Sequence, residues 1–361
     1  MRRSDVVAIS GVKSFGLIAA MTGALSSGGV MLTLDRNFPA ERQKLLVREV
    51  GVAHILYVGE FRNEDEWMRD LDSTSLIYVD ADGALTAQAI AGSNSNDAGL
   101  PALAPNDPAY IFFTSGTTGV PKGILGCHKG LSHFLAWQRD TFAIGPNDRV
   151  AQLTPLSFDV LLRDVFLPLT CGASVHLPDE REGLAPDSIL PWLARERISV
   201  LHTVPALAQS WLADAPRDLS FPDLRWVFFS GEPLQDSLIK RWRDTFSLTA
   251  GIVNLYGPTE TTMVKCFHRV VDEEPLGAQP VGRPLPQTQA LVLNANGDLC
   301  GIGEPGEIAI RTPFRTLGYV NAPDENRKRF VKNPFRDDDD DLLYLTGDRG
   351  RYRPDGTLMM E

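Results

Sequence analysis

A glycine-rich segment in the first third of the chain holds the residues whose types and spacing best suggest chemistry. An apolar run, Tyr110 to Phe113, leads into Thr114-Ser115-Gly116-Thr117-Thr118-Gly119-Val120-Pro121-Lys122-Gly123. Glycines allow backbone N–H groups to converge on an anion, hydroxyl groups add donors, and one lysine adds a mobile positive charge. We therefore expect this loop to bind phosphate, with a mobile surface loop as the competing interpretation. It is not a Walker A loop, because Pro121 precedes Lys122 and Gly123 stands where Ser or Thr would ligate magnesium.

Two more polar motifs follow apolar runs later in the chain. In Asn254 to Thr262, Tyr256 offers a flat ring on which a purine can stack, and Thr259 offers a hydroxyl group to phosphate. Glu260 can hold magnesium, which binds carboxylate and phosphate oxygens, or it can serve only as a contact at a helix N-terminus. Asp348, within Thr-Gly-Asp, can accept both hydrogen bonds of a ribose diol, and the competing interpretation is a plain turn aspartate.

The segment Gly301 to Gly306 satisfies the dinucleotide pattern GxGxxG, but its context does not. A Rossmann fingerprint must open a helix whose N-terminus faces pyrophosphate. Here Pro305 and the strand-like Glu307 to Ile310 follow. We predict a turn between strands, and no nicotinamide cofactor is implied.

The elements around these motifs alternate between short apolar runs and longer amphipathic stretches. Such alternation predicts an α/β fold with helices packed on mainly parallel sheets. After about Gln279 the pattern changes to short strands separated by glycine turns, which indicates a small β-rich lobe. We expect an α/β core over residues 1–280 and the lobe over 281–361. The predicted strands include Val52 to Val58, Ser199 to Val204, Trp226 to Phe229 and Ala290 to Leu293, and the predicted helices include Lys129 to Thr141, Leu184 to Glu196 and Leu234 to Phe246.

Composition excludes several classes of protein. The chain has 361 residues and a formal charge of -11, with no run of Lys or Arg longer than three residues, which disfavours binding to nucleic acid. Its four cysteines form no CxxC pair and its histidines no HExxH motif, so neither a disulfide scaffold nor a zinc site is expected, and a reducing, cytoplasmic location fits.

The uncharged stretch Ser14 to Leu34 suggests a membrane span or signal, but Ser26 to Gly29 interrupt it. We predict a helix over Phe15 to Leu25, a glycine turn and a strand over Val30 to Leu34.

Taken together, the motifs resemble those of the adenylate-forming enzymes. The phosphate loop, the Asn254 to Thr262 block, Gly306-Glu307-Ile308 with Arg315 to Asn321, and Tyr344 to Asp348 occur in the order of that superfamily. The stretch Ala24 to Arg42 is similar to the branch that activates amino acids, the adenylation domains of nonribosomal peptide synthetases. The resemblance implies an acetyl-CoA synthetase-like core followed by a small β-barrel-like lobe.

The resemblance also implies a reaction and a set of roles. Such enzymes use ATP and Mg²⁺ to join a carboxylate to AMP with release of pyrophosphate, and then pass the acyl group to the phosphopantetheine thiol of a peptidyl carrier domain. Lys122, Thr259 and Glu260 would serve catalysis, with Glu260 on the metal. The nucleotide would contact Thr114, Ser115, Gly116, Thr117, Thr118, Gly119, Lys122, Tyr256, Thr259 and Asp348, and Gly231 and Glu232 match the segment that lies along the adenine.

The residues that match the family's substrate pocket begin with Asp159. It stands where amino-acid-activating members hold the α-ammonium group, which favours an α-amino acid over a fatty or aryl acid. The competing interpretation is that Asp159 only caps a helix that begins there. The other lining positions are Val160, Arg163, His202, Phe228, Ser230, Leu255, Met263 and Val264.

Arg163 decides how that pocket is interpreted. Val160, His202, Ser230 and Leu255 resemble pockets that select serine, but those pockets carry tryptophan where Arg163 stands. A guanidinium group suits a carboxylate, so the first hypothesis is an acidic side chain and the second a small polar one. Arg163 also follows Asp159 by four residues, so a salt bridge on one helix face is a third interpretation.

The family's second essential lysine, carried on a C-terminal lid, has no match in this sequence. We therefore expect a fragment, or a large core whose lid lies elsewhere in a longer polypeptide, and poor adenylation by the isolated chain. The family's first N-terminal strands and helices also have no match before Asp5. Two alternatives remain: a carboxylate:CoA ligase of the same superfamily, and a non-catalytic core that acts as a scaffold.

Overall fold

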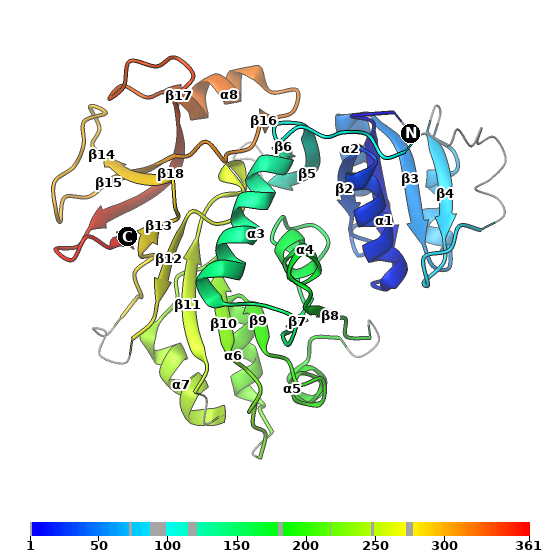
Figure 1. The fold of residues 1–361 in the computed structure, drawn as a ribbon, viewed down its shortest axis with the longest axis horizontal. Helices are drawn as coiled ribbons and strands as arrows, with labels where there is room; N and C mark the ends of the chain where they lie inside the picture. The colour runs from blue at the N-terminus through cyan, green and yellow to red at the C-terminus, as the bar shows by residue number, and fades with distance from the viewer. Residues whose placement is uncertain are drawn as a thin grey trace. The chain divides into compact units, whose positions relative to one another are not determined.

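The computed structural model describes residues 2–71, 74–86, 99–114, 121–179, 183–216, 218–246, 249–271 and 277–361. These residues form two compact units (Figure 1). Unit 1 comprises Met1–Ser132, Pro155–Asp159 and Thr316–Asn326, and unit 2 comprises His133–Thr154, Val160–Arg315 and Arg327–Glu361. Two helices, α3 (His128–Phe142) and α8 (Pro323–Arg329), begin in unit 1 and end in unit 2.

Unit 1 is built on a seven-stranded sheet in the order β16-β6-β5-β2-β1-β3-β4. The five strands from β5 to β4 pair in parallel, and the β5–β6 and β6–β16 pairs are antiparallel. Apolar side chains of these strands, such as Leu32, Ile55 and Ile111, are buried in one core with Leu46 of α2. The strands are β1 (Val6–Gly11), β2 (Val30–Leu34), β3 (Val52–Val58), β4 (Ser75–Val79), β5 (Pro108–Thr114), β6 (Lys122–Cys127) and β16 (Gly318–Tyr319), and the helices are α1 (Phe15–Ser26), α2 (Ala40–Val50) and the 3-10 helix η1 (Asn63–Met68).

The uncharged stretch near the N-terminus forms a helix, a turn and a strand, as predicted. Helix α1 begins where the Ser14 hydroxyl group accepts a hydrogen bond from the Leu17 amide, and it ends before Gly28, which has a φ of 75°. Glycine adopts that left-handed conformation without steric cost, so the chain can turn there into β2. Within the described ranges, no helix is long and apolar enough to cross a membrane.

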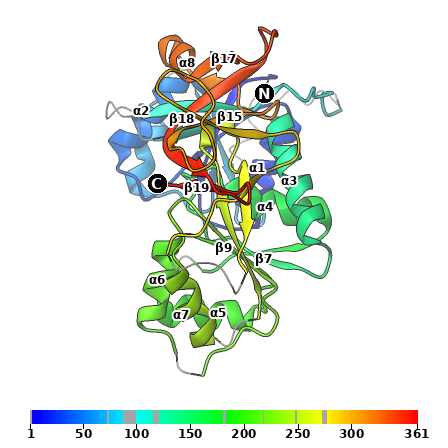
Figure 2. The same ribbon diagram turned by 90° about the vertical axis from the view of Figure 1, so that its left-hand side faces the viewer.

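Unit 2 contains a second seven-stranded sheet, in the order β13-β12-β11-β10-β9-β7-β8. Strands β11, β10, β9, β7 and β8 pair in parallel, which confirms the predicted mainly parallel arrangement. Figure 2 shows the helices α5, α6 and α7. Their apolar side chains, which include Trp211 of α6 and Trp242 of α7, are buried in one core. The strands are β7 (Arg149–Ala151), β8 (Ser174–His176), β9 (Val200–Thr203), β10 (Trp226–Ser230), β11 (Gly251–Tyr256), β12 (Cys266–Arg269) and β13 (Arg283–Pro284), and the helices are α4 (Leu161–Cys171), α5 (Pro186–Arg195), α6 (Pro205–Ala213), α7 (Asp236–Phe246) and the 3-10 helix η3 (Thr259–Thr261).

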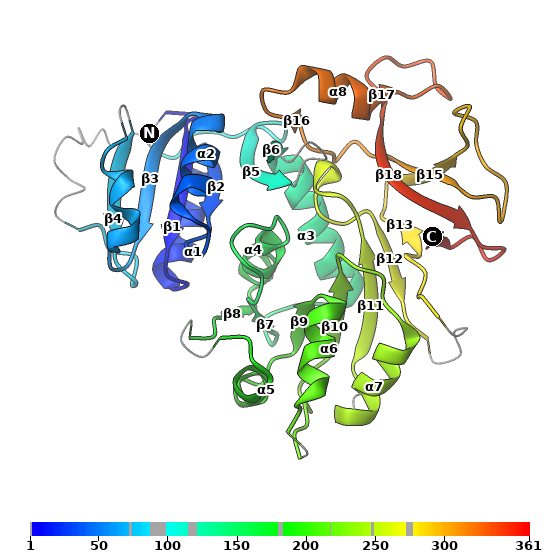
Figure 3. The same cartoon turned by 180° about the vertical axis from the view of Figure 1, so that it is seen from behind.

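A third sheet, also in unit 2, is antiparallel throughout. Strands β15 and β18 lie side by side (Figure 3), with β14, β17 and β19 paired around them. Gly301 to Pro305 form a turn before β15, so the GxGxxG segment opens a strand and not a helix, as predicted. The division of the chain at residue 280 stays a prediction. The strands are β14 (Gln289–Leu293), β15 (Gly306–Arg311), β17 (Phe330–Lys332), β18 (Leu342–Tyr352) and β19 (Leu358–Met360).

Trp242 is the side chain whose removal tests the core of unit 2. It is fully buried and contacts Trp211, Phe229 and Phe246. We expect Trp242→Ala to lower the free energy of unfolding by about 3–5 kcal/mol, because the cavity cannot collapse completely. Urea unfolding followed by circular dichroism measures this. Leu169→Ala, at a side chain 47% exposed, is the control and should cost less than about 1 kcal/mol; equal losses would contradict the assignment of the core.

Candidate active site

The glycine-rich loop connects two strands that pair with each other. β5 ends at Thr114 and β6 begins at Lys122, and the Cα atoms of these two residues are direct partners in the antiparallel register. The hairpin therefore fixes where the loop starts and where its lysine stands, although the sequence did not indicate β6. The predicted phosphate contacts Ser115, Gly116, Thr117, Thr118 and Gly119 lie outside the described residues.

Lys122 already has a charged partner within unit 1. Its Nζ lies 2.9 Å from Oε2 of Glu325 on α8, and 5.9 Å from the ring centroid of Tyr319. Both side chains of the ion pair are largely buried, with 18% and 20% exposed. A phosphate that binds Lys122 must compete with this carboxylate for the same ammonium group. Glu325 was not among the predicted site residues, and only the fold places it beside the lysine.

The Asn254 to Thr262 motif forms a tight reversal after β11. The backbone N–H of Lys265 donates to the carbonyl of Tyr256 at 2.7 Å, which closes the loop. A Cβ on Gly257 would lie 2.4 Å from the Met263 carbonyl oxygen, so only glycine fits there. Thr262 and Met263 have positive φ angles of 72° and 57°, and such backbone strain commonly occurs at functional sites.

The same reversal positions several predicted residues. Leu255, Met263 and Val264 are all buried, and Thr259 and Glu260 lie in η3 directly after Pro258. The N-terminal cap of η3 is Pro258, so Glu260 does not cap this helix. Mg²⁺ is usually held by one or two carboxylates together with substrate phosphates, and the single buried carboxylate of Glu260 fits that pattern.

Tyr256 and Asp348 meet within unit 2. The Tyr256 hydroxyl group donates a hydrogen bond of 2.7 Å to Oδ2 of Asp348, and burial together with this carboxylate raises the pKa of the phenol. Asp348 lies inside strand β18, so the competing interpretation as a plain turn aspartate is wrong. The reason is Gly347, whose φ of 82° makes room for a bulge where β18 shifts register against β15. The hydrogen bond fixes both the tyrosine ring and the carboxylate.

Parallel pairing gathers other predicted residues at one edge of the second sheet. His202 and Phe228 are register partners on β9 and β10, and Ser230 and Leu255 are partners on β10 and β11. Carboxyl ends of parallel strands lie on the same edge of a sheet, which is where α/β proteins bind ligands. Gly231 follows β10 with a φ of 89°, and the Glu232 carboxylate accepts a hydrogen bond from the Ala206 amide at the start of α6.

Asp159 is buried and is the last residue of the segment Pro155–Asp159 of unit 1. The next residue, Val160, belongs to unit 2. The N-terminal cap of α4 is Val160, which makes no side-chain cap hydrogen bond. Asp159 therefore does not occupy the cap position of this helix. Its role toward a substrate amine stays a prediction.

Arg163 is buried in a polar network that sequence reasoning missed. Its Nε lies 3.3 Å from Oδ1 of Asp164, and its Nη1 lies 3.4 Å from the Ser230 hydroxyl group. The same Asp164 oxygen is 3.2 Å from Nδ1 of His202, and the other oxygen accepts a hydrogen bond of 2.5 Å from Thr154. Asp164 and Thr154 gave no motif, because only the fold brings the segment after β7, α4 and β9 together.

The network fixes the protonation of His202. Burial, followed by the nearby guanidinium group of Arg163, lowers the pKa of His202 to about 4, so the ring is neutral near pH 7. Nε2 lies 2.8 Å from the Gln138 side-chain amide, which donates to it, and this leaves the proton on Nδ1 facing Asp164. Burial opposes ionisation of Asp164, but His202, Arg163 and Thr154 together lower its pKa. The ring of His202 also stacks on Phe228, with centroids 4.9 Å apart.

The comparison with known families decides the identity. A family of proteins described as AMP-binding enzymes matches residues 1–320. The chain belongs to the AMP-binding enzyme family. The predicted resemblance to adenylate-forming enzymes is thereby confirmed, and nonribosomal peptide synthetases are among the relatives.

Two kinds of relative cover nearly all of the chain. Tyrocidine synthase 3 of Brevibacillus parabrevis is 32% identical over 98% of the chain, and the L-2-aminoadipate reductase large subunit of Eremothecium gossypii is 29% identical over 99%. The chain spans only 5% and 29% of the lengths of these two proteins.

Solved structures agree with this assignment. The nonribosomal peptide synthetase FmoA3 superposes over 100% of the chain and 37% of its own, with 29% identity and a TM-score of 0.85. The N-terminal subdomain of Klebsiella oxytoca NpsA, 22% identical over 100% of the chain and 87% of its own, has a TM-score of 0.81 and supports the fold alone.

The low pKa of His202 makes stability depend on pH. Between its ordinary value of 6.5 and about 4, the unfolded residue binds a proton and the folded residue does not, so stability falls as the pH falls through this window. We expect a loss on the order of 3 kcal/mol from this residue. Urea unfolding at pH 7 and at pH 4.5 measures the free energy of unfolding. The difference between the two values should be smaller for His202→Gln than for the wild type. The same pH dependence in both proteins would contradict the buried, neutral state of His202.

The ion pair of Lys122 leads to a second prediction. Glu325→Gln removes the carboxylate that competes for the ammonium group, and we expect ATP to bind about 3- to 10-fold more tightly. Isothermal calorimetry measures the affinity. Asp324→Asn, at the neighbouring exposed position of α8, removes the same net charge and is the matched control. Equal changes in both variants, or weaker binding by Glu325→Gln, would show that the ion pair does not compete with the nucleotide.

Proposed function

We propose that this chain activates an α-amino acid with ATP, forming an aminoacyl-AMP and pyrophosphate for transfer to the phosphopantetheine thiol of a peptidyl carrier domain. The observation that carries the proposal is the family match, which spans both the Lys122 hairpin and the Tyr256 motif. FmoA3 has been solved with AMPPNP and with α-methyl-L-serine-AMP, and its 28–29% identity over the whole chain supports the same chemistry here.

The main difficulty of the reaction is charge. A carboxylate must approach the α-phosphate of ATP although both are anions, so catalysis consists largely of neutralising charge and aligning the attacking oxygen. In this proposal Lys122, with the hydroxyl and amide groups of its loop, stabilises the departing pyrophosphate. Thr259 donates to phosphate, and no protein nucleophile is required.

The nucleoside is held by residues of unit 2. Asp348 accepts hydrogen bonds from the ribose diol, and its own hydrogen bond to Tyr256 orients it for this. The ring of Tyr256 and the backbone at Gly231 and Glu232 contact the adenine. Glu260 would hold Mg²⁺ together with the phosphates, and the ion would supply further positive charge there.

The amino acid is recognised at its ammonium group by Asp159. A buried carboxylate is stabilised by a cationic partner, and a substrate without an amine does not supply one. The side chain of the substrate contacts the lining residues from Val160 to Val264 named above, with Arg163 and Ser230 as its polar partners and the ring of His202 as part of the wall. Acidic and small polar side chains are the two candidates that these residues allow.

Amino-acid-dependent exchange of pyrophosphate into ATP tests the proposal. We expect Lys122→Ala to lower the exchange rate by about 100-fold, because it removes charge stabilisation at the departing phosphates. Lys44→Ala is the control, since Lys44 is on α2 and pairs with Glu41. We also expect Asp159→Ala to remove the preference for substrates that carry an amine.

The two alternatives give different results in the same experiments. Thioester formation with free coenzyme A, unaffected by Asp159→Ala, would indicate a carboxylate:CoA ligase. Failure to bind ATP by calorimetry would indicate a non-catalytic scaffold. Either result would refute amino-acid activation.

A further inference from the structure

Asp164 is a buried carboxylate that contacts two of the predicted lining residues of unit 2, Arg163 and His202. It is fully buried in the first turn of α4, where the positive end of the helix dipole also stabilises an anion. Its two oxygens contact Arg163, His202 and Thr154 at the distances given above. Arg163 precedes Asp164 on α4, His202 is on β9 and Thr154 lies in the segment after β7, so the carboxylate ties α4 to β9 and to that segment.

The charges in this cluster balance. Arg163 carries one positive charge and Asp164 one negative charge, and the His202 ring is neutral near pH 7. Arg163 uses Nε on Asp164 and Nη1 on Ser230, so its guanidinium group is already engaged by a carboxylate and a hydroxyl group. The arginine that suggested an acidic substrate is thus one half of a buried ion pair.

We propose that Asp164 is a positioning residue that neutralises Arg163 and orients His202, so that the pocket selects an uncharged, hydrogen-bonding amino-acid side chain over an acidic one. The inference rests on the proposed function and names the substrate class of that site. An acidic side chain beside Arg163 would also lie close to Asp164, and the repulsion between two buried carboxylates disfavours it. A neutral hydroxyl or amide group can exchange hydrogen bonds with Ser230 and with the guanidinium group without adding charge.

The role of Asp164 is one of positioning because its contacts are to other residues of the wall. With Asp164 on Nδ1 and Gln138 on Nε2, the ring of His202 cannot turn without breaking a contact. Stacking on Phe228 fixes its plane. Asp164 therefore determines which hydrogen-bonding groups the wall can offer, and these are the groups of Arg163 and Ser230.

The experiment compares two non-hydrolysable adenylate analogues, seryl- and glutamyl-sulfamoyladenosine, by calorimetry on the chain. We expect the wild type to bind the seryl analogue at least about 10-fold more tightly. Asp164→Asn keeps the shape and removes the negative charge that faces Arg163 and repels a second carboxylate, so the ratio should shift toward the glutamyl analogue by about 10-fold or more. If the role of Asp164 were purely structural, Asp164→Asn would weaken the binding of both analogues equally and leave the ratio of the two affinities unchanged.

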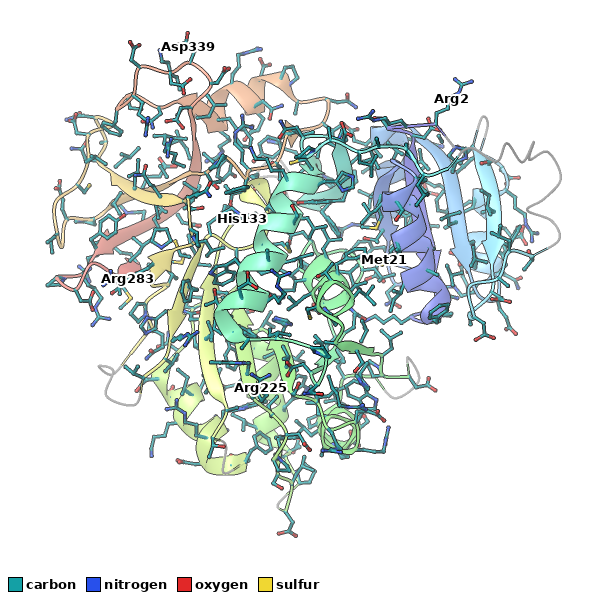
Figure 4. All side chains as sticks on the ribbon, viewed as in Figure 1. Arg2, Met21, His133, Arg225, Arg283 and Asp339 are labelled. Carbon is teal, nitrogen blue, oxygen red and sulfur yellow. The ribbon has the colours of Figure 1, made fainter. Side chains whose placement is uncertain are left out.

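Asp148→Asn is the matched control. Asp148 is equally buried in unit 2 and pairs with Arg225, labelled in Figure 4, through two contacts of 2.7 Å. It precedes β7, at the amino edge of the parallel strands and away from their carboxyl ends. The same substitution there should leave the ratio within about two-fold of the wild type.

If Asp164→Asn does not fold, the double variant Asp164→Asn with Arg163→Gln tests the role of Asp164 instead. It removes both charges and leaves the wall neutral. It should keep the preference for the seryl analogue. A wild type that prefers the glutamyl analogue, an unchanged ratio in Asp164→Asn, or a double variant that prefers the glutamyl analogue would overturn the role of Asp164 and leave amino-acid activation standing. Binding of neither analogue to the wild type would overturn the proposed function and this inference with it.

Discussion

The parallel hydrogen bonding of β9, β10 and β11 is the constraint on which the site in unit 2 depends. Parallel register places His202 beside Phe228, and Ser230 beside Leu255, with all four near the carboxyl ends of their strands. The chain leaves each strand at this edge, so the reversal at Gly257 and the loop at Gly231 also begin here. A shift of one residue in any strand would turn these side chains to the opposite face of the sheet.

Electroneutrality is the second constraint, and it acts in both units. A charged group that is withdrawn from water requires a partner, and the described structure supplies one for each of the two basic residues that the sequence singled out. Lys122 is paired with Glu325, and Arg163 with Asp164. In both cases the partner changes what the basic residue can do for a ligand, because an incoming anion meets a neutralised pair and not a free cation.

Rigidity at these positions comes from side chains that hold other side chains. Tyr256 orients Asp348, Gln138 and Asp164 orient His202, and His133, labelled in Figure 4, stacks on Phe314 with ring centroids 3.6 Å apart. Burial and the nearby Lys265 ammonium group lower the pKa of His133 to about 4, so this stack is formed by a neutral ring near pH 7. Groups held in this way lose little entropy when a ligand binds, which favours selectivity.

The sequence by itself determined the classes of element and the chemistry of the motifs. Hydrophobic periodicity is local, so the runs Val52 to Val58 and Trp226 to Phe229 predicted β3 and most of β10, and the family resemblance followed from the order of four polar blocks. Only the tertiary structure decided the partners. Glu325 lies about two hundred residues from Lys122, Asp348 lies in a bulged strand and not in a turn, and Asp164 belongs to no motif. Contacts of this kind depend on which strands pair and where helices begin, and no local pattern of residue types encodes that long-range geometry.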